Sequence, residues 1–402
     1  MEIAFFSDSY APLKDGVASE VQALARELRR QGHGVTVFAP EPRLGAAPRD
    51  EVIDGVSVVR CRALPVPRYP QLRWALFPFA RLAGRRFGSR IQVVHIHTPG
   101  LLGTAGFLAA RRYRLPVVGT FHTDVYAARE SFGPHPLVRL FFWAARWYTL
   151  GLYYRCASVT VPTEPARAAL LKHARKPFRG PVPVVPNGIE LGRFRPGLDR
   201  PDWRGRYGIG PEPLVLFLGR LTRDKGIHRL LDAVAALPPT VPAAVLVGGT
   251  GPEELAVRER IANDPRLRSR VRFVGVVPEE EKAAFLAQGD LFVLPSTSDT
   301  SSVAVLEAMA SGLPCLVTDV GGPKMLVEDG VSGRIVPAEP AGALAEGLAE
   351  LLRAPELRAR LRRGALARVA AEGSIETTAR RFISLYGLVG AGGGSADGPR
   401  VG

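Results

Sequence analysis

A strand, a polar loop and a helix follow one another between residues 291 and 311, and this unit constrains the fold more than any other stretch. The apolar run Leu291–Leu294 predicts a buried strand, and Ser302–Ser311 predicts a helix with one apolar face. Gly312 ends that helix, and Cys315–Thr318 predicts the next strand. The polar loop therefore lies at the carboxyl end of a strand and leads into a helix N-terminus. Open α/β sheets bind ligands at that place, and a phosphate is stabilised there.

Two carboxylates flank the start of this helix. Asp299 lies in the loop, and Glu307 follows eight residues later, in the helix. Taken alone, both are compatible with ordinary solvated acids near a helix start. Their spacing also lets both reach a single ligand over the edge of the sheet. In that case one carboxylate accepts hydrogen bonds from sugar hydroxyls and the other from a ribose.

The same arrangement occurs earlier in the second half of the chain. The strand Leu214–Leu218 is followed by a loop with Arg220 and Lys225 and then by the helix Ile227–Ala236. An arginine can form paired hydrogen bonds with phosphate oxygens, and a lysine adds a point charge. The next predicted strand ends in a glycine-rich turn that contains Gly251. The pattern favours an anionic ligand such as a diphosphate.

The N-terminal half begins with a strand–loop–helix–strand unit. We predict strands at Ile3–Phe6 and Val35–Ala39 and a helix at Ala18–Arg30. The unit lacks the G-x-G-x-x-G fingerprint, so it does not indicate a dinucleotide site. Gly16, just before the helix, is compatible with a simple turn or with close approach of the backbone to a phosphate.

Three histidines lie in or after the predicted strands Val93–His97 and Val117–Thr120. His122 follows the second strand and starts a polar loop, where a histidine is a better functional candidate than in a core. His95 and His97 form an H-x-H pair, but no nearby Cys or Glu completes a ligand set, so we expect no metal site.

Several other segments carry structural expectations. Val52–Cys61 predicts a hairpin turned at Asp54-Gly55. Val182–Val185 is predicted as the last strand of the first half, and 278–287 as a short helix. Residues 64–73 are rich in proline and are interpreted as a connection. The aromatic stretch 137–155 predicts a helix that either packs in the core or faces a membrane.

The second-half motifs resemble those of retaining GT-B glycosyltransferases of the glycosyl transferases group 1 family. Residues 307–314, Glu-Ala-Met-Ala-Ser-Gly-Leu-Pro, match the end of the family's E-x7-E region, with Asp299 in place of the first Glu. Residues 219–226 repeat the family's G-R-x-x-x-x-K-G. Ser301 and Ser302 stand where Phe-Gly is usual, which leaves the donor sugar open.

The resemblance implies an α/β fold of the GT-B type, with two Rossmann-like domains facing each other across a cleft. We expect an acceptor domain at 1–188 and a nucleotide-sugar donor domain at 189–373. A closing helix at 374–388 is expected to pack back on the first domain, and 389–402 to form a disordered tail.

The resemblance also implies site residues and chemistry. We expect His122, Arg220 and Lys225 to act in catalysis. The expected donor-binding residues are Gly16, Arg220, Lys225, Gly251, Asp299, Ser301, Ser302, Val303 and Glu307. The implied reaction is transfer of a hexose, glucose or mannose, from a UDP-, GDP- or ADP-sugar with retention. No D-x-D occurs in the sequence, which agrees with transfer that requires no metal or other cofactor.

The charge distribution suggests a partner for the first half. Residues 1–190 contain 26 Lys and Arg against 13 Asp and Glu, whereas the rest contains 27 against 25. Such a basic half indicates a membrane surface, nucleic acid or an anionic acceptor, although arginine-rich coding gives the same excess. The Tyr69-Pro70 segment resembles lipid-directed family members, so we expect a lipid acceptor and an anionic membrane surface. The expected acceptor or membrane residues are Tyr69, Arg73, Arg85, Arg86 and Asp124.

Composition bounds the remaining choices. The three cysteines, Cys61, Cys156 and Cys315, are far apart and suggest a reducing compartment. We expect neither a signal peptide nor a transmembrane stretch, and we expect a cytoplasmic enzyme, peripheral on the membrane. The alternatives are a soluble or polysaccharide acceptor, a nucleotide-sugar epimerase on the same fold, and a basic nucleic-acid-binding protein.

Overall fold

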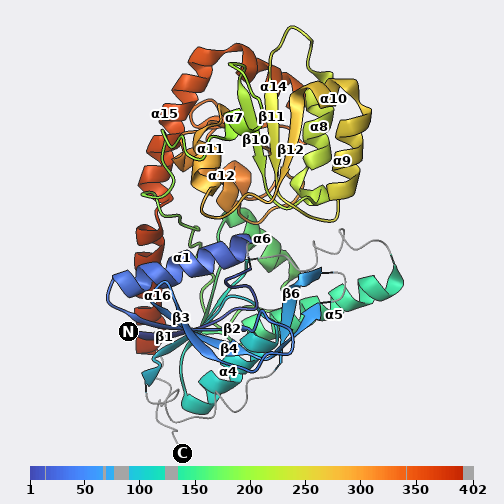
Figure 1. The fold of residues 1–402 in the computed structure, drawn as a ribbon. Helices are drawn as coiled ribbons and strands as arrows, with labels where there is room; N and C mark the ends of the chain where they lie inside the picture. Colours follow the sequence, from blue (N-terminus) through green and yellow to red (C-terminus); the bar gives the residue numbers. More distant parts are fainter. Residues whose placement is uncertain (14, 67–68, 77–89, 123–134, 341, 393–402) are drawn as a thin grey trace, which may run out of the picture. The chain divides into compact units, whose positions relative to one another are not determined.

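The computed structural model describes residues 1–392 apart from residue 14 and residues 67–68, 77–89, 123–134 and 341. The chain divides into two compact units. The first comprises Met1–Gly188 together with the chain from Ile375 onward, and the second comprises Ile189–Ser374. Each unit contains its own mainly parallel sheet with helices packed against it (Figure 1).

The described sheet of the first unit has seven strands in the order β3-β4-β2-β1-β7-β8-β9, and within it β3 runs antiparallel to β4. Its strands are β1 (Glu2–Phe6), β2 (Gly34–Pro40), β3 (Asp50–Ile53), β4 (Val56–Cys61), β7 (Val93–Ile96), β8 (Val117–Thr120) and β9 (Ser158–Thr160). Phe6 pairs with Phe38 on β2 and with Ile96 on β7. The carboxyl ends of three neighbouring strands therefore meet at one edge, which positions the loops that follow them.

Five helices frame this sheet in the described part of the first unit. They are α1 (Gly16–Arg30), α4 (Leu101–Tyr113), α5 (Pro136–Tyr153), α6 (Glu164–His173) and α16 (Ile375–Gly392). The side chain of Asp15 caps α1 by accepting a hydrogen bond from Ala18 N at 2.8 Å. α1 packs against α16, and Leu24 of α1 and Phe382 of α16 belong to the same buried cluster. The helix after residue 374 thus completes the first unit.

The predicted hairpin at 52–61 is confirmed. Its turn residues Asp54 and Gly55 have positive φ values of 50° and 77°, the backbone that a two-residue hairpin turn requires.

Three expectations for the first unit differ from the structure. Val182–Val185 forms only an isolated bridge between Val161 and Val184. Pro181 and Pro183 accept hydrogen bonds there but have no N–H to donate, so no full ladder forms. The proline-rich connection contains an antiparallel pair, β5 (Ala63–Val66) and β6 (Tyr69–Ala75). α16 continues to Gly392, beyond the expected start of the tail at residue 389; residues 393–402 lie outside the described part.

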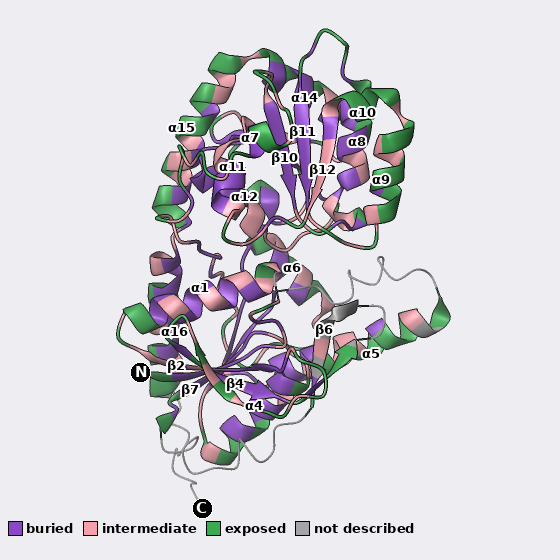
Figure 2. Ribbon diagram, viewed as in Figure 1, coloured by how far each residue is buried: buried purple, intermediate pink, exposed green. Residues whose placement is uncertain are grey.

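The described sheet of the second unit has six strands, all parallel, in the order β12-β11-β10-β13-β14-β15. They are β10 (Leu214–Leu218), β11 (Ala244–Gly248), β12 (Val271–Gly275), β13 (Leu291–Leu294), β14 (Cys315–Thr318) and β15 (Gly333–Val336). Buried residues fill the central strands, whereas exposed residues lie on the outer faces of the helices (Figure 2). Because the central strands are buried on both faces, they appear in the sequence as continuous apolar runs.

Helices cover both faces of this second sheet. They are α7 (Trp203–Arg206), α8 (Ile227–Ala236), α9 (Glu254–Asn263), α10 (Pro265–Arg270), α11 (Lys282–Ala287), α12 (Val303–Ala310), α13 (Pro323–Leu326), α14 (Gly342–Arg353) and α15 (Pro355–Glu372). The helix expected from residue 278 begins only at Lys282, because residues 278–281 form an irregular turn. This turn places Glu279 and Lys282 side by side.

Candidate functional site

Four loops of the second unit converge at the carboxyl edge of its sheet. Leu221 N, in the loop after β10, donates to Thr250 O after β11 at 2.9 Å. Thr297 N, after β13, donates to Asp224 O at 2.8 Å, and Gly322 N, after β14, donates to Asp299 O at 2.7 Å. The loops are thus joined by backbone hydrogen bonds, so the polar residues that they carry lie close together.

Two glycines allow these loops to approach closely. Gly226 has φ +73°, and a Cβ there would lie 1.9 Å from Pro295 O. A Cβ on Gly251 would lie 2.4 Å from Leu221 O. Gly251, predicted from the sequence as a donor-binding residue, therefore has a packing reason to be glycine.

Lys225 and Asp299 form an ion pair in this site. Lys225 Nζ lies 2.5 Å from Asp299 Oδ2, and their side chains are only 17% and 6% exposed. Lys225 ends a short 3₁₀ turn before α8, while Asp299 lies in the loop before α12. The structure brings together one residue expected to bind phosphate and one expected to bind sugar hydroxyls.

Glu307 is buried one turn into α12 and is paired with Lys282, a residue that the sequence reasoning missed. Lys282 Nζ lies 2.6 Å from Glu307 Oε1 and 3.1 Å from Glu279 Oε1. Burial raises the pKa of Glu307 above its usual value, although Lys282 opposes the rise. Burial would lower the pKa of Lys282, but Glu307 and Glu279 outweigh it and raise that pKa, so Lys282 stays charged.

The start of α12 offers hydrogen-bonding groups to a ligand. Ser302 is the N-cap residue, yet its side chain makes no capping hydrogen bond, and Val303 begins the helix. Within the described residues, the hydroxyls of Ser296 and Ser301 are buried without a partner. Unpaired buried hydroxyls beside a helix N-terminus are expected where a ligand supplies the missing partner.

Arg220 differs from the other cations of this edge. It is exposed, and its guanidinium has no side-chain partner among the residues that the structure describes. Arg223, three residues later, is paired with Glu253 at 3.3 Å. Arg220 is therefore available for an external anion.

In the first unit, His122 lies at the carboxyl edge of the sheet and contacts two buried side chains. His122 Nδ1 lies 3.2 Å from Glu20 Oε2 on α1, and His122 Nε2 lies 3.2 Å from His97 Nδ1. Glu20 comes one turn after Gly16, a spacing that could have indicated it. A Cβ on Gly16 would meet nothing within 4 Å, so packing does not explain that glycine.

Asp8 is a further polar group at this edge that the sequence reasoning missed. It follows β1, and its Oδ2 accepts a hydrogen bond from Thr98 Oγ1 at 2.9 Å. Burial raises the pKa of Asp8 to about 6, and the Thr98 hydrogen bond opposes the rise. A carboxyl group with such a pKa is a candidate for contact with substrate.

His95 has a hydrogen-bond partner on each ring nitrogen. His95 Nδ1 lies 2.6 Å from the hydroxyl of Tyr386 on α16, and His95 Nε2 lies 2.7 Å from Thr120 Oγ1. Burial lowers the pKa of His95 and of His97 well below the usual value, so both are neutral at pH 7. Among the described residues, no group of three or more His, Cys, Asp or Glu side chains is arranged to hold a metal ion.

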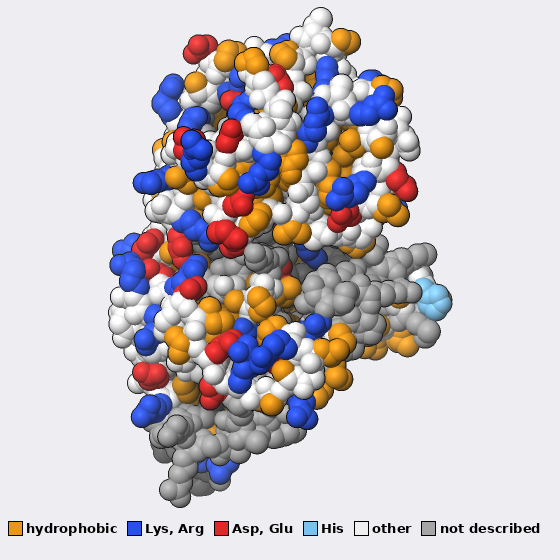
Figure 3. All heavy atoms as spheres, in the orientation of Figure 1, with side chains coloured by type: hydrophobic (Ala, Val, Ile, Leu, Met, Phe, Trp, Pro, Cys, Tyr) orange, Lys and Arg blue, Asp and Glu red, His pale blue; other side chains and the backbone are white. Residues whose placement is uncertain are grey.

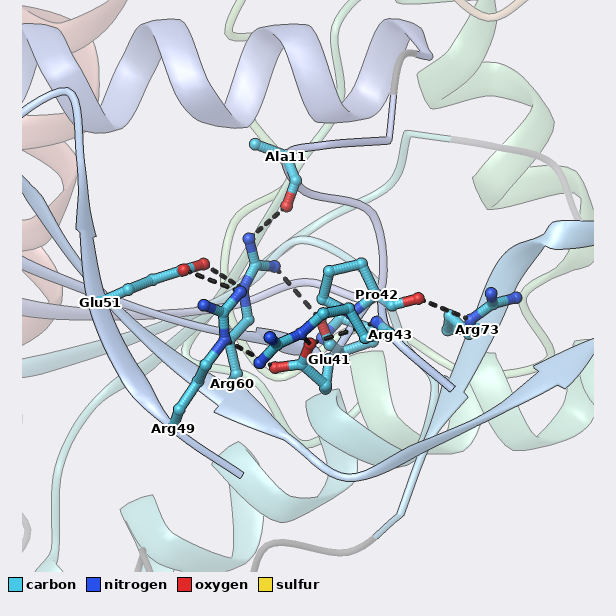
Figure 4. Close-up of polar contacts among 9 residues, drawn as sticks. Ala11, Glu41, Pro42, Arg43, Arg49, Glu51, Arg60 and Arg73 are labelled. Atoms are coloured by element: carbon cyan, nitrogen blue, oxygen red, sulfur yellow. Dashed lines mark hydrogen bonds and ion pairs between the residues drawn. The ribbon is translucent and has the colours of Figure 1, made fainter. Parts of the chain in front are cut away.

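The expected acceptor or membrane residues are described only in part. Arg73 on β6 donates from Nε to Pro42 O at 3.3 Å, beside a buried network centred on Arg60 and Glu41 (Figure 4). Arg60 also donates to Ala11 O at 2.5 Å, in the loop that leads to Gly16. The Arg73 side chain is thus held by the backbone that follows β2. Arg85, Arg86 and Asp124 lie outside the described residues, as does the side chain of Tyr69.

Comparison with known proteins decides the family. A model of glycosyl transferases group 1 matches residues 199–368, and one of Glycosyltransferase Family 4 matches residues 14–193. A GDP-mannose-dependent alpha-mannosyltransferase of Mycolicibacterium smegmatis is 32% identical over 330 residues, covering 81% of this chain and 82% of that protein. The chain belongs to the glycosyl transferases group 1 family. It is a glycosyltransferase, and the predicted enzyme class is confirmed.

Other similarities agree with this family. An alpha-monoglucosyldiacylglycerol synthase of Streptococcus pneumoniae is 28% identical over 358 residues, covering 87% of this chain and 78% of that protein. A sucrose-phosphate synthase from Thermosynechococcus elongatus has a TM-score of 0.79 at 24% identity, covering 98% of this chain and all of that one. HepE of Anabaena in complex with UDP-glucose has a TM-score of 0.75 at 18% identity, covering 96% of this chain and 100% of that one. The predicted GT-B fold class is confirmed.

Proposed function

We propose that this glycosyltransferase moves a hexose, glucose or mannose, from a nucleoside diphosphate sugar to a lipid acceptor, with retention of configuration. The observation that supports the donor most directly is the placement of Arg220, Lys225, Asp299 and Glu307 on hydrogen-bonded loops and the adjoining helix of one sheet edge. The related mannosyltransferase is GDP-mannose-dependent by name, and the HepE structure contains UDP-glucose.

Each group of the donor has a matching group at this edge. Arg220 and Lys225 bind the diphosphate and stabilise its negative charge as the bond between the sugar and the diphosphate breaks. The N-terminus of α12, with Ser301, Ser302 and Val303, supplies further donors to the phosphate. Glu307 accepts hydrogen bonds from the ribose, and Asp299 accepts them from hydroxyls of the sugar.

We propose that transfer at this site requires no metal ion. Two cations beside the diphosphate perform the charge neutralisation that a divalent ion performs elsewhere. The bond between the anomeric carbon and the leaving phosphate breaks, the acceptor hydroxyl oxygen bonds to that carbon on the same face, and the leaving phosphate accepts the hydroxyl proton. The acceptor is assigned to the first unit; at the carboxyl edge of its sheet lie Asp8, the predicted catalytic residue His122, and Gly16, which was predicted to bind the donor.

A donor panel tests the proposal. The protein is titrated with UDP-, GDP- and ADP-glucose and with GDP-mannose by calorimetry, and the tightest donor is then screened against diacylglycerol, glycolipids and soluble sugars. We expect one nucleotide to bind best and transfer to persist in EDTA. Turnover of donor without acceptor into an epimer would support the epimerase alternative. No binding of any nucleotide sugar would refute the proposal, and activity that chelation removes and Mg²⁺ or Mn²⁺ restores would refute its metal-independent part.

α5 of the first unit offers a surface for membrane contact. Leu140, Phe141 and Trp143 are between 50% and 60% exposed, although large apolar side chains are usually buried. Figure 3 shows hydrophobic side chains at the surface along this helix. Arg139 beside them is exposed as well. Among the described residues, no helix is long and apolar enough to cross a membrane.

We therefore propose peripheral docking of the first unit on an anionic membrane, which the 26 basic against 13 acidic residues within residues 1–190 favour. Each basic residue near such a surface contributes about 1 kcal/mol. Replacing Leu140, Phe141 and Trp143 by Gln is expected to reduce co-sedimentation with anionic vesicles at least about fivefold, while transfer to a water-soluble acceptor analogue is retained. Leu255→Gln in α9, which is 68% exposed in the second unit, is the matched control. Binding that ignores lipid charge and the α5 replacements would contradict docking through this helix.

A further inference from the structure

Glu307 uses one carboxylate oxygen to bind Lys282 and leaves the other available. Its Oε1 lies 2.6 Å from Lys282 Nζ, whereas Oε2 has no hydrogen-bond partner among the described residues. The side chains of Glu307 and Lys282 are 6% and 11% exposed. In such surroundings an ionised carboxylate needs a counter-ion. Lys282 supplies it from the first position of α11, a helix that packs against α12.

Lys282 is itself held from its other side. Glu279 Oε1 lies 3.1 Å from Lys282 Nζ and 2.8 Å from Arg193 Nη2. Burial would raise the pKa of Glu279, but Lys282 and Arg193 outweigh it and lower that pKa. The four side chains form a row of alternating charge from Glu307 through Lys282 and Glu279 to Arg193. The ammonium group of Lys282 therefore has a fixed place beneath Glu307.

We propose that Lys282 is a positioning residue for the donor: it keeps Glu307 ionised and orients Oε2 toward the ribose hydroxyls. The inference rests on the proposed function, because it assigns Glu307 to the ribose. It adds a residue that belongs to neither the E-x7-E region nor the G-R-x-x-x-x-K-G motif. Lys282 acts through Glu307 and makes no contact with the reacting atoms.

The protonation state of Glu307 determines how nucleotide binding should depend on pH. Ribose hydroxyls donate to a carboxylate better than to a carboxyl group, so binding weakens as Glu307 is protonated. Burial raises the pKa of Glu307 and Lys282 lowers it, so loss of Lys282 lets that pKa rise further. Arg193 also lowers it and Glu279 raises it. Of the other elements packed on α12, α15 contributes Arg362 beside Gly312, and β14 contributes the Cys315 thiol, whose pKa burial raises.

The experiment measures binding of UDP, GDP and ADP by calorimetry between pH 5 and 8.5. For the nucleotide that binds wild-type protein best, we expect Lys282→Met to weaken binding about 10- to 100-fold. We also expect the pH below which binding weakens, the acidic limb of the profile, to rise by about one pH unit or more. Lys282→Arg is expected to restore most of the affinity. In transfer assays of Lys282→Met, we expect the KM for the donor to rise by a larger factor than kcat falls.

Arg204→Met is the matched control. Arg204 pairs with Asp290 at 2.6 Å, and Asp290 accepts from Leu214 N at the amino end of β10, the opposite edge of the same sheet. This variant also loses an ion pair and some stability, yet we expect nucleotide affinity and its acidic limb to stay unchanged.

A double-mutant cycle with Glu307→Gln decides whether Lys282 acts through Glu307. If it does, Lys282→Met weakens binding no further once Glu307 is neutral. The inference would be overturned if Lys282→Met weakened binding as much in the Glu307→Gln protein as in the wild-type protein. It would also be overturned if a folded Lys282→Met protein bound nucleotide with unchanged affinity and unchanged pH dependence. If that variant does not fold, Glu279→Gln replaces it, and an unchanged pH limb there is the contradicting result. Failure of the wild-type protein to bind any of the three nucleotides would instead refute the proposed function.

Discussion

Arg220→Ala is expected to reduce transfer at least about 100-fold while the melting temperature stays within about 1 °C of wild type. The loss of rate follows because a charge-assisted contact to the developing diphosphate is removed. Stability is retained because Arg220 is exposed and has no side-chain partner within the described structure. The measurements are kcat/KM for the preferred donor and thermal unfolding of the same preparation.

Arg223→Ala is the control for this variant. Arg223 lies three residues away, is 80% exposed and pairs with Glu253. The Arg223→Ala variant removes the same charge from the same loop. A general electrostatic effect would therefore lower the transfer rates of Arg220→Ala and Arg223→Ala equally. Near-normal transfer by Arg220→Ala, or an equal loss in Arg223→Ala, would contradict the role of Arg220.

Lys225→Met is expected to lose transfer to at least the same extent, about 100-fold or more, and to lose stability as well. Its ammonium group lies 2.5 Å from Asp299, whose side chain is only 6% exposed. Removing Lys225 leaves that carboxylate buried without its counter-ion, which costs roughly 3–5 kcal/mol. Activity and unfolding by denaturant are measured together.

The double variant Lys225→Met/Asp299→Asn separates the two effects. Neutralising Asp299 removes the unpaired charge, so we expect most of the lost stability to return while transfer stays low. Recovery of activity together with stability would show that Lys225 has only a structural role. Near-normal turnover in the single variant would remove it from the donor site altogether.

Local patterns were sufficient to predict the strands and helices of the site. β10, α8, β13 and β14 have the predicted bounds, because their apolar runs and the Gly, Pro or Asp residue that follows each within two positions are local signals. Predictions were less successful where prolines interrupt the pattern. Val184 forms only an isolated bridge, and Ala63–Val66 and Tyr69–Ala75 form a pair of strands. A proline removes a backbone donor, but its effect depends on whether the neighbouring strand needs that donor.

The sequence by itself determined the type of fold, the family and the polar residues that follow each strand, because strand ends and helix starts are encoded within a few residues. Only the tertiary structure decided which of these residues are partners. Lys225 and Asp299 are 74 positions apart, and Lys282 and Glu307 are 25 apart. His122 likewise meets Glu20 on α1. Such pairs depend on which strands are neighbours and on side-chain distances of about 3 Å, and spacing along the chain encodes neither.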